Sequence, residues 1–190
     1  MESVEWLERA HLLDPLSPYV GGLAAFSLLM LFRDDEALAH VEPAVVSNPN
    51  HPVALYFAGA AYMRLGQHGK AIEVIERAVQ VMDRLPFYVG WAGWAYGVAG
   101  REAEARVLLD ELRARSTTEY VMNTSVACIL GALGEHDEAF EYFGRAMDEG
   151  EALLRFAYLP PFDPVRDDPR FHALLRRMNF PQTAGTSPTA

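Results

Sequence analysis

The sequence of 190 residues has little of what several classes of protein require. It holds a single cysteine, which excludes an internal disulfide and fits a reducing compartment, so we expect a cytoplasmic protein. Lysine and arginine number 16 against 26 aspartates and glutamates, and the net charge of −10 argues against nucleic acid, whose phosphates require a basic surface. The most apolar run, residues 20–32, is shorter than the roughly 20 residues that cross a bilayer, and the acidic N-terminus argues against a secretory signal.

The residue patterns that carry catalysis are also missing. No two histidines stand in an H-x-x-x-H pair, and none has a cysteine or carboxylate at metal-ligand spacing. The glycines fall within helical patterns, so none forms a phosphate-binding loop between a strand and a helix. The carboxylates Asp163, Asp167 and Asp168 stand beside prolines, where helix caps and turns explain them. We therefore expect no enzyme, no catalytic residue, no metal and no cofactor.

What the sequence does contain is a period of 34 residues. Small residues and aromatics recur at this step in several columns, among them Ala37, Ala71, Ala105, Ala139; Gly66, Gly100, Gly134; and Leu28, Tyr62, Tyr96, Leu130. A fixed period of this length is typical of a protein built from stacked structural repeats.

Each repeat has the pattern of two antiparallel helices. In the unit that spans Val53 to Val81, Leu55, Ala58, Gly59, Tyr62 and Met63 have the 3-and-4 spacing of one helix face. Gly66 then predicts a left-handed helix end, and Ala71, Ile75 and Ala78 form the face of a second helix. The small side chains of Gly59 and Ala71 would let the two helices approach closely, which gives an αα-hairpin.

These residues resemble the tetratricopeptide repeat family. The second unit matches it at Leu55, Ala58, Gly59, Tyr62, Ala71, Ile75 and Ala78, and the other three units match in register, without the family's first-helix tryptophan and with Phe32 in place of the glycine. The resemblance implies an all-α fold, a right-handed α-α superhelix (solenoid) of helix hairpins with a C-terminal capping helix.

The repeat register also divides the chain. We expect the second helix of an incomplete repeat at 1–17, four tetratricopeptide repeats at 18–151 (18–51, 52–85, 86–119 and 120–151), a C-terminal helical cap at 152–180 and a mobile tail at 181–190. Residues 151–158 should form one more helix, and Asp168 before Pro169 predicts the start of a short amphipathic one. This closing segment resembles the end of the repeat region in large bacterial regulators that carry nucleotide-cyclase, kinase or winged-helix modules.

In such solenoids the first helix of each repeat lines a concave groove that binds a partner. The resemblance places ten residues of this chain in that groove: Tyr19, Phe26, Tyr56, Met63, Arg64, Phe87, Gly90, Trp94, Gly97 and Cys128. Only Arg64 could clamp a carboxylate, so an apolar or aromatic ligand is favoured. Gly90 and Gly97 flank Trp94 without an evident packing role, which predicts an exposed tryptophan in a hot-spot pocket. The alternative is that these aromatics only pack the superhelix.

The functional hypothesis is a non-enzymatic protein-interaction scaffold that binds an apolar or aromatic peptide or helix in the groove. The alternative is a structural spacer, or a dimerisation or regulatory region of a larger signalling or transcription-regulatory protein, with the groove filled by its own chain. Because the helix around Trp6, Leu7, Ala10 and Leu13 has an apolar face without a partner helix, we also expect a homodimer through the N-terminal helix.

Overall fold

The computed structural model describes residues 2–14 and 16–180, apart from the side chains of residues 2–5, 8 and 11. The described residues form α-helices and two 3₁₀ turns, with no strand. The expected mobile tail at 181–190 lies outside them, as does Pro15. The elements are α1 (Glu2–Leu13), α2 (Pro18–Met30), α3 (Asp34–Ser47), α4 (Pro52–Arg64), α5 (His68–Val81), α6 (Pro86–Val98), α7 (Glu102–Arg115), α8 (Asn123–Ala132), α9 (His136–Asp148), η1 (Ala152–Phe156), η2 (Pro160–Val165) and α10 (Pro169–Arg177).

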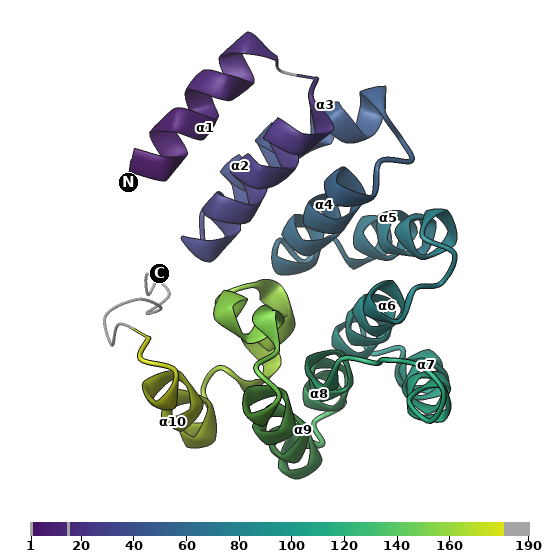
Figure 1. Cartoon of the computed structure of the whole chain (residues 1–190). Coiled ribbons are helices and arrows are strands. Elements are labelled where there is room, and N and C mark those ends of the chain that lie inside the picture. The colour runs from purple at the N-terminus through teal and green to yellow at the C-terminus, as the bar shows by residue number, and fades with distance from the viewer. Residues whose placement is uncertain (1, 15, 181–190) are drawn as a thin grey trace.

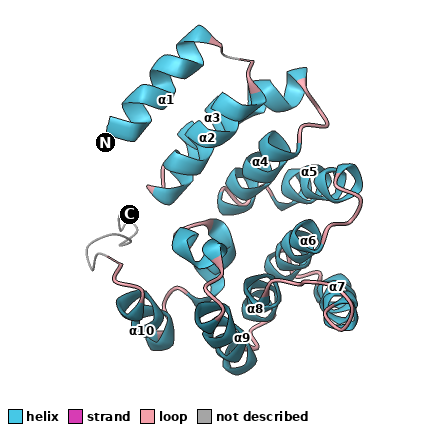
Figure 2. Ribbon diagram, viewed as in Figure 1, coloured by secondary structure: helices cyan, strands magenta, loops and turns pink. Residues whose placement is uncertain are grey.

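Consecutive helices pair as antiparallel hairpins, α2 with α3, α4 with α5, α6 with α7 and α8 with α9. The hairpins follow one another along a curve, with α2, α4, α6 and α8 on its inner side (Figure 1). The chain between α9 and α10 returns into the space that this curve encloses (Figure 2). The expected all-α solenoid is therefore confirmed.

The helix boundaries follow from the residues that stand there. Pro18, Pro52 and Pro86, spaced by 34, occupy the first turn of α2, α4 and α6, where the missing N–H of proline costs no hydrogen bond. Gly66 has a φ of 70° at the end of α4, as predicted, because only glycine takes this conformation without strain. At the equivalent position after α2, Phe32 takes a φ of 58° despite its side chain.

The repeating alanines lie in the core. Ala37, Ala71, Ala105 and Ala139 are all fully buried, as the predicted register requires. A periodic contact joins neighbouring repeats, because the hydroxyl of Tyr62 donates to Glu42 and that of Tyr96 donates to Glu76. Burial and the neighbouring Glu76 carboxylate raise the pKa of Tyr96 to about 12, so this hydroxyl stays protonated and remains a donor.

Gly90 and Gly97 have a packing role that the sequence did not reveal. A Cβ at Gly90 would lie 2.5 Å from the Cβ of Ser125, and one at Gly97 would lie 2.7 Å from that of Ala132. Both glycines therefore allow α6 and α8 to approach, and the expectation that no packing needs them is wrong. Between α4 and α6 the contact is made by aromatic rings, with Tyr56 stacked on Trp91 at 4.0 Å between centroids.

The segment after α9 differs from the expected helix at 151–158. It forms only the short 3₁₀ turn η1, after which the Leu159 N–H donates to the Phe156 carbonyl at 2.9 Å, and Pro160, which has no N–H to donate, begins η2. The second expectation for this region is confirmed: α10 begins at Pro169, and the Asp168 side chain accepts a hydrogen bond from the Arg170 N–H at 2.9 Å.

Candidate functional site: the concave groove and its C-terminal arm

The groove is partly filled by the chain itself. We call residues 152–166, which include η1 and η2, the C-terminal arm. The arm lies inside the curve of α2, α4, α6 and α8 (Figure 1), and Leu159, Phe162 and Val165 are buried there. Its rings touch the first and the last repeat, since Phe156 lies 5.2 Å from Phe26 and Phe162 lies 5.8 Å from Phe143 between centroids. The arm therefore spans the groove from one end to the other.

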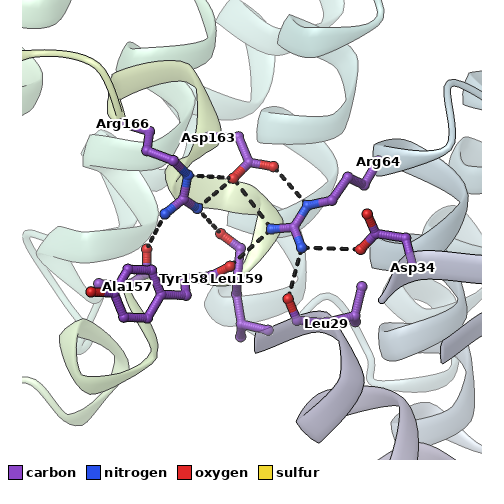
Figure 3. Close-up of polar contacts among 8 residues, drawn as sticks. All are labelled: Leu29, Asp34, Arg64, Ala157, Tyr158, Leu159, Asp163 and Arg166. Carbon is purple, nitrogen blue, oxygen red and sulfur yellow. Dashed lines mark hydrogen bonds and ion pairs between the residues drawn. The ribbon is translucent and has the colours of Figure 1, made fainter. Parts of the chain in front are cut away.

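Arg64, at the C-terminal end of α4, is the main polar link between the arm and the repeats (Figure 3). Its guanidinium donates to the backbone carbonyls of Leu29 at 2.8 Å and Tyr158 at 2.8 Å. It also pairs with the carboxylates of Asp34 at 3.1 Å and Asp163 at 3.0 Å. The side chain is only 10% exposed, so these contacts form where water screens charge weakly. Burial raises the pKa of Asp34, and the charge of Arg64 opposes that rise.

Two carboxylates anchor the arm at its ends. At the far end Asp163 accepts from both Arg64 and Arg166, and Arg166 also reaches the carbonyls of Ala157 and Leu159 (Figure 3).

At the near end the buried Glu151 caps α8, accepting from the backbone N–H groups of Asn123 at 2.6 Å and Thr124 at 2.9 Å. This carboxylate satisfies free N–H groups at the helix N-terminus, where the helix dipole favours negative charge.

Trp94 lies beneath the arm and is not exposed in an open groove. Only 1% of its surface is accessible, and the space among Trp94, Cys128, Leu159 and Phe162 amounts to about 10 Å³. That volume is close to the minimum that holds one water molecule, so a peptide has no room there. The expectation of an exposed tryptophan is therefore wrong, because the arm covers it.

One part of the groove remains open. A pocket of about 390 Å³ lies between the N-terminal half of the groove and η1. We call it the open pocket; its walls are formed by Leu23, Phe26, Tyr56, Phe57, Phe87, Met122, Leu153, Phe156 and Leu159. Tyr56 alone among these carries a polar side-chain oxygen, and burial raises its pKa well above the ordinary value. The pocket therefore offers apolar surface and aromatic rings, with no charge.

The other chemical features of the described residues add no reactive group. No cluster of three or more His, Cys, Asp or Glu side chains suited to a metal occurs among residues 2–14 and 16–180. Cys128 is buried, and burial raises the pKa of its thiol, which keeps it unreactive. Within the same ranges, no helix is long and apolar enough to cross a membrane.

The ten residues expected in the groove fall into four groups. Phe26, Tyr56 and Phe87 line the open pocket. Met63, Arg64, Trp94 and Cys128 are buried or nearly so, with Arg64 bound to the arm, while Gly90 and Gly97 serve helix packing. Tyr19 is exposed and its ring packs edge-on against His51 at 4.7 Å, outside the open pocket. The structure thus brings only three of the ten together at a free surface; their binding role stays a prediction.

Several residues of the site were missed from the sequence. Leu23 and Phe57 line the open pocket and stand 34 residues apart. They therefore form a repeating column of their own, next to the column of Tyr56, and this column could have been predicted to face the groove. Leu153, Phe156, Leu159 and Asp163 belong to the arm, which lies outside the repeats. No periodic signal could have placed them.

Comparisons with known proteins agree with this architecture. Residues 52–81 match the family model described as a tetratricopeptide repeat. No curated protein shows significant sequence similarity to the chain. Among solved structures, the chain is similar to a thermophilic TPR protein of Thermus thermophilus, with 22% identity, a TM-score of 0.62, and 81% of this chain and 87% of that one covered.

Two further structures resemble the chain at lower identity. MamA shares 18% identity with a TM-score of 0.53, over 80% of this chain and 89% of that one. A tetratricopeptide repeat protein from Parabacteroides merdae shares 15% identity with a TM-score of 0.53, over 92% of this chain and 70% of that one. These likenesses, with the matched repeat, support the tetratricopeptide resemblance and define the fold as a tetratricopeptide-type solenoid.

Proposed function

We propose that this chain is a non-enzymatic protein-interaction scaffold whose open pocket takes an aromatic or long aliphatic side chain of a partner peptide. The observation that carries the proposal is the open pocket itself, an uncharged space of about 390 Å³ with four phenylalanine side chains in its wall. Large apolar side chains inserted into such pockets supply most of the binding energy in protein interfaces. The tetratricopeptide resemblance favours the same function.

A peptide selection followed by calorimetry tests the proposal. Peptides displayed on phage are selected on the full chain, and the affinity of a synthetic copy is then measured for two variants. Leu23→Gln changes a pocket residue that is 49% exposed, while Leu31→Gln changes a leucine at the end of the same helix that is 51% exposed and outside the pocket. Both substitutions therefore change little of the core.

We expect the selected peptides to share an aromatic or long aliphatic residue, and Leu23→Gln to weaken them about tenfold, which corresponds to the loss of about 1.4 kcal/mol of contact in the pocket. Leu31→Gln should leave the affinity unchanged. Equal binding by all three proteins would place the interaction elsewhere and refute the proposal.

The second candidate function is a structural spacer or dimerisation region of a larger regulator. It is favoured by one observation, the arm that occupies the groove over Trp94 and Cys128. The resemblance of the closing segment to the end of the repeat region in large bacterial regulators is consistent with this candidate. A selection that yields no peptide sensitive to Leu23→Gln would favour it over the scaffold.

A further inference from the structure

The open pocket is a composite of the repeats and the arm. Leu153, Phe156 and Leu159 of the arm form one wall, and the side chains from α2, α4 and α6, with Met122 before α8, form the others. Without the arm this space would be an open trough, because nothing else among its lining residues faces the repeats. The arm thus has two faces: one covers Trp94, and the other shapes the open pocket.

The wall-forming part of the arm is held from both sides. Glu151, immediately before η1, is bonded to the N-terminus of α8, directly after Met122. Asp163, in η2, is bonded to Arg64, which also holds the carbonyl of Tyr158 at 2.8 Å, next to Leu159. Residues 153–159 therefore lie between two anchor points, and their position depends on both.

We propose that the arm is a fixed wall of the ligand pocket, and that Arg64 is a positioning residue for ligand binding although it does not line the pocket. The inference rests on the proposed function and specifies how its site is built. Ligand binding and arm docking then favour each other, since coupling between two binding events is reciprocal. If the arm instead inhibited the groove, ligand binding and arm docking would oppose each other, because release of the arm would uncover Trp94 and Cys128 for a ligand.

The test loosens the arm and measures the pocket in the full chain. The probe is 1-anilinonaphthalene-8-sulfonate, an aromatic fluorophore that brightens in apolar sites, titrated against each protein. Asp163→Asn weakens the bond to Arg64. Asp167→Asn is its control, because Asp167 is exposed and this substitution removes the same charge at a nearby position. Leu23→Gln reports whether the probe occupies the open pocket, and thermal melts confirm that each variant is folded.

We expect Asp163→Asn to raise the Kd of the probe at least about fivefold, within the usual range of coupling between sites. Asp167→Asn should leave the Kd unchanged. Unchanged or tighter binding by Asp163→Asn overturns the inference, and tighter binding shows that the arm is an inhibitor. If Leu23→Gln leaves the Kd of the probe unchanged, the open pocket is not the binding site. That result contradicts the proposed function and is distinct from a failure of the arm to act as a wall.

An engineered disulfide distinguishes two causes of weaker probe binding, a displaced arm and a general loss of stability. Gly131 on α8 and Val165 in η2 are in contact, because a Cβ at Gly131 would lie 2.9 Å from Cγ1 of Val165, so two cysteines placed there are close enough to be tested as a disulfide. The pair Gly131→Cys and Val165→Cys is added to Asp163→Asn, while the buried Cys128 stays a thiol. We expect oxidation to restore probe binding and reduction to raise the Kd again at least about fivefold. If the oxidised protein binds no better than the reduced one, Arg64 and Asp163 do not act by positioning the arm.

Discussion

At the scale of single residues, depth of burial separates two tryptophans that were both predicted from the sequence to lie at exposed surfaces. Trp94 is 1% exposed beneath the arm, whereas Trp6 on α1 is 66% exposed. We expect Trp94→Ala to lower the free energy of unfolding by about 3–5 kcal/mol, because it leaves a cavity in the core. Trp6→Ala should change it by less than about 0.5 kcal/mol in the monomer. Urea titrations of dilute protein measure both, and equal stabilities would contradict the burial of Trp94.

Two glycines provide a second comparison. A Cβ at Gly97 would lie 2.7 Å from Ala132, whereas one at Gly144 on α9 meets no atom within 4 Å. Gly97→Ala should therefore destabilise by about 1–3 kcal/mol through overpacking of α6 against α8. Gly144→Ala should stabilise by about 0.5–1 kcal/mol through helix propensity. A melting temperature of Gly97→Ala that equals or exceeds that of the wild type would show that α6 and α8 are not in close contact.

At the scale of elements, α10 depends on its cap. Hydrogen bonds from the Arg170 side chain and backbone lower the pKa of Asp168 from 3.8 to about 2. A lowered pKa means that the carboxylate stabilises the fold above pH 3.8 and that this contribution is lost as the pH falls toward 2. We expect the melting temperature of the wild type to exceed that of Asp168→Asn at about pH 6, and the gap to shrink between about pH 4 and pH 2. A gap that stays constant over this range would exclude Asp168 as the titrating group.

At the scale of the whole molecule, the N-terminal end of the solenoid presents an apolar surface. Trp6, Leu12, Leu13 and Leu16 are exposed on and after α1, which packs on α2 from one side only. An exposed apolar patch of this kind tends to be an interface, so a homodimer stays a prediction. We expect concentration-dependent association in sedimentation that Trp6→Glu weakens. Val107→Glu, on the exposed face of α7, is the control and should leave association unchanged. A monomer at high concentration would refute the homodimer.

The sequence by itself determined the repeating part of this protein. The 34-residue period fixes which side chains meet inside a hairpin, because each contact is local and is repeated with the same small residues. Ala71 and Gly66 could therefore be assigned correctly, one to the buried face of its helix and the other to a left-handed helix end. The same register identified Phe26, Tyr56 and Phe87, three residues of the open pocket.

Only the tertiary structure decided what occupies the groove. The contact between Arg64 and Asp163 joins residues 99 apart, and neither residue belongs to a repeating column that predicts it. The path of the arm depends on where Pro160 and Pro161 turn the chain and on which apolar surface lies within reach, and both are properties of the assembled superhelix. For this reason Trp94 lies in the core and Leu23 lies in the wall of the open pocket. The period predicts which face of a helix points into the groove, but the distant C-terminal arm determines whether that face stays open.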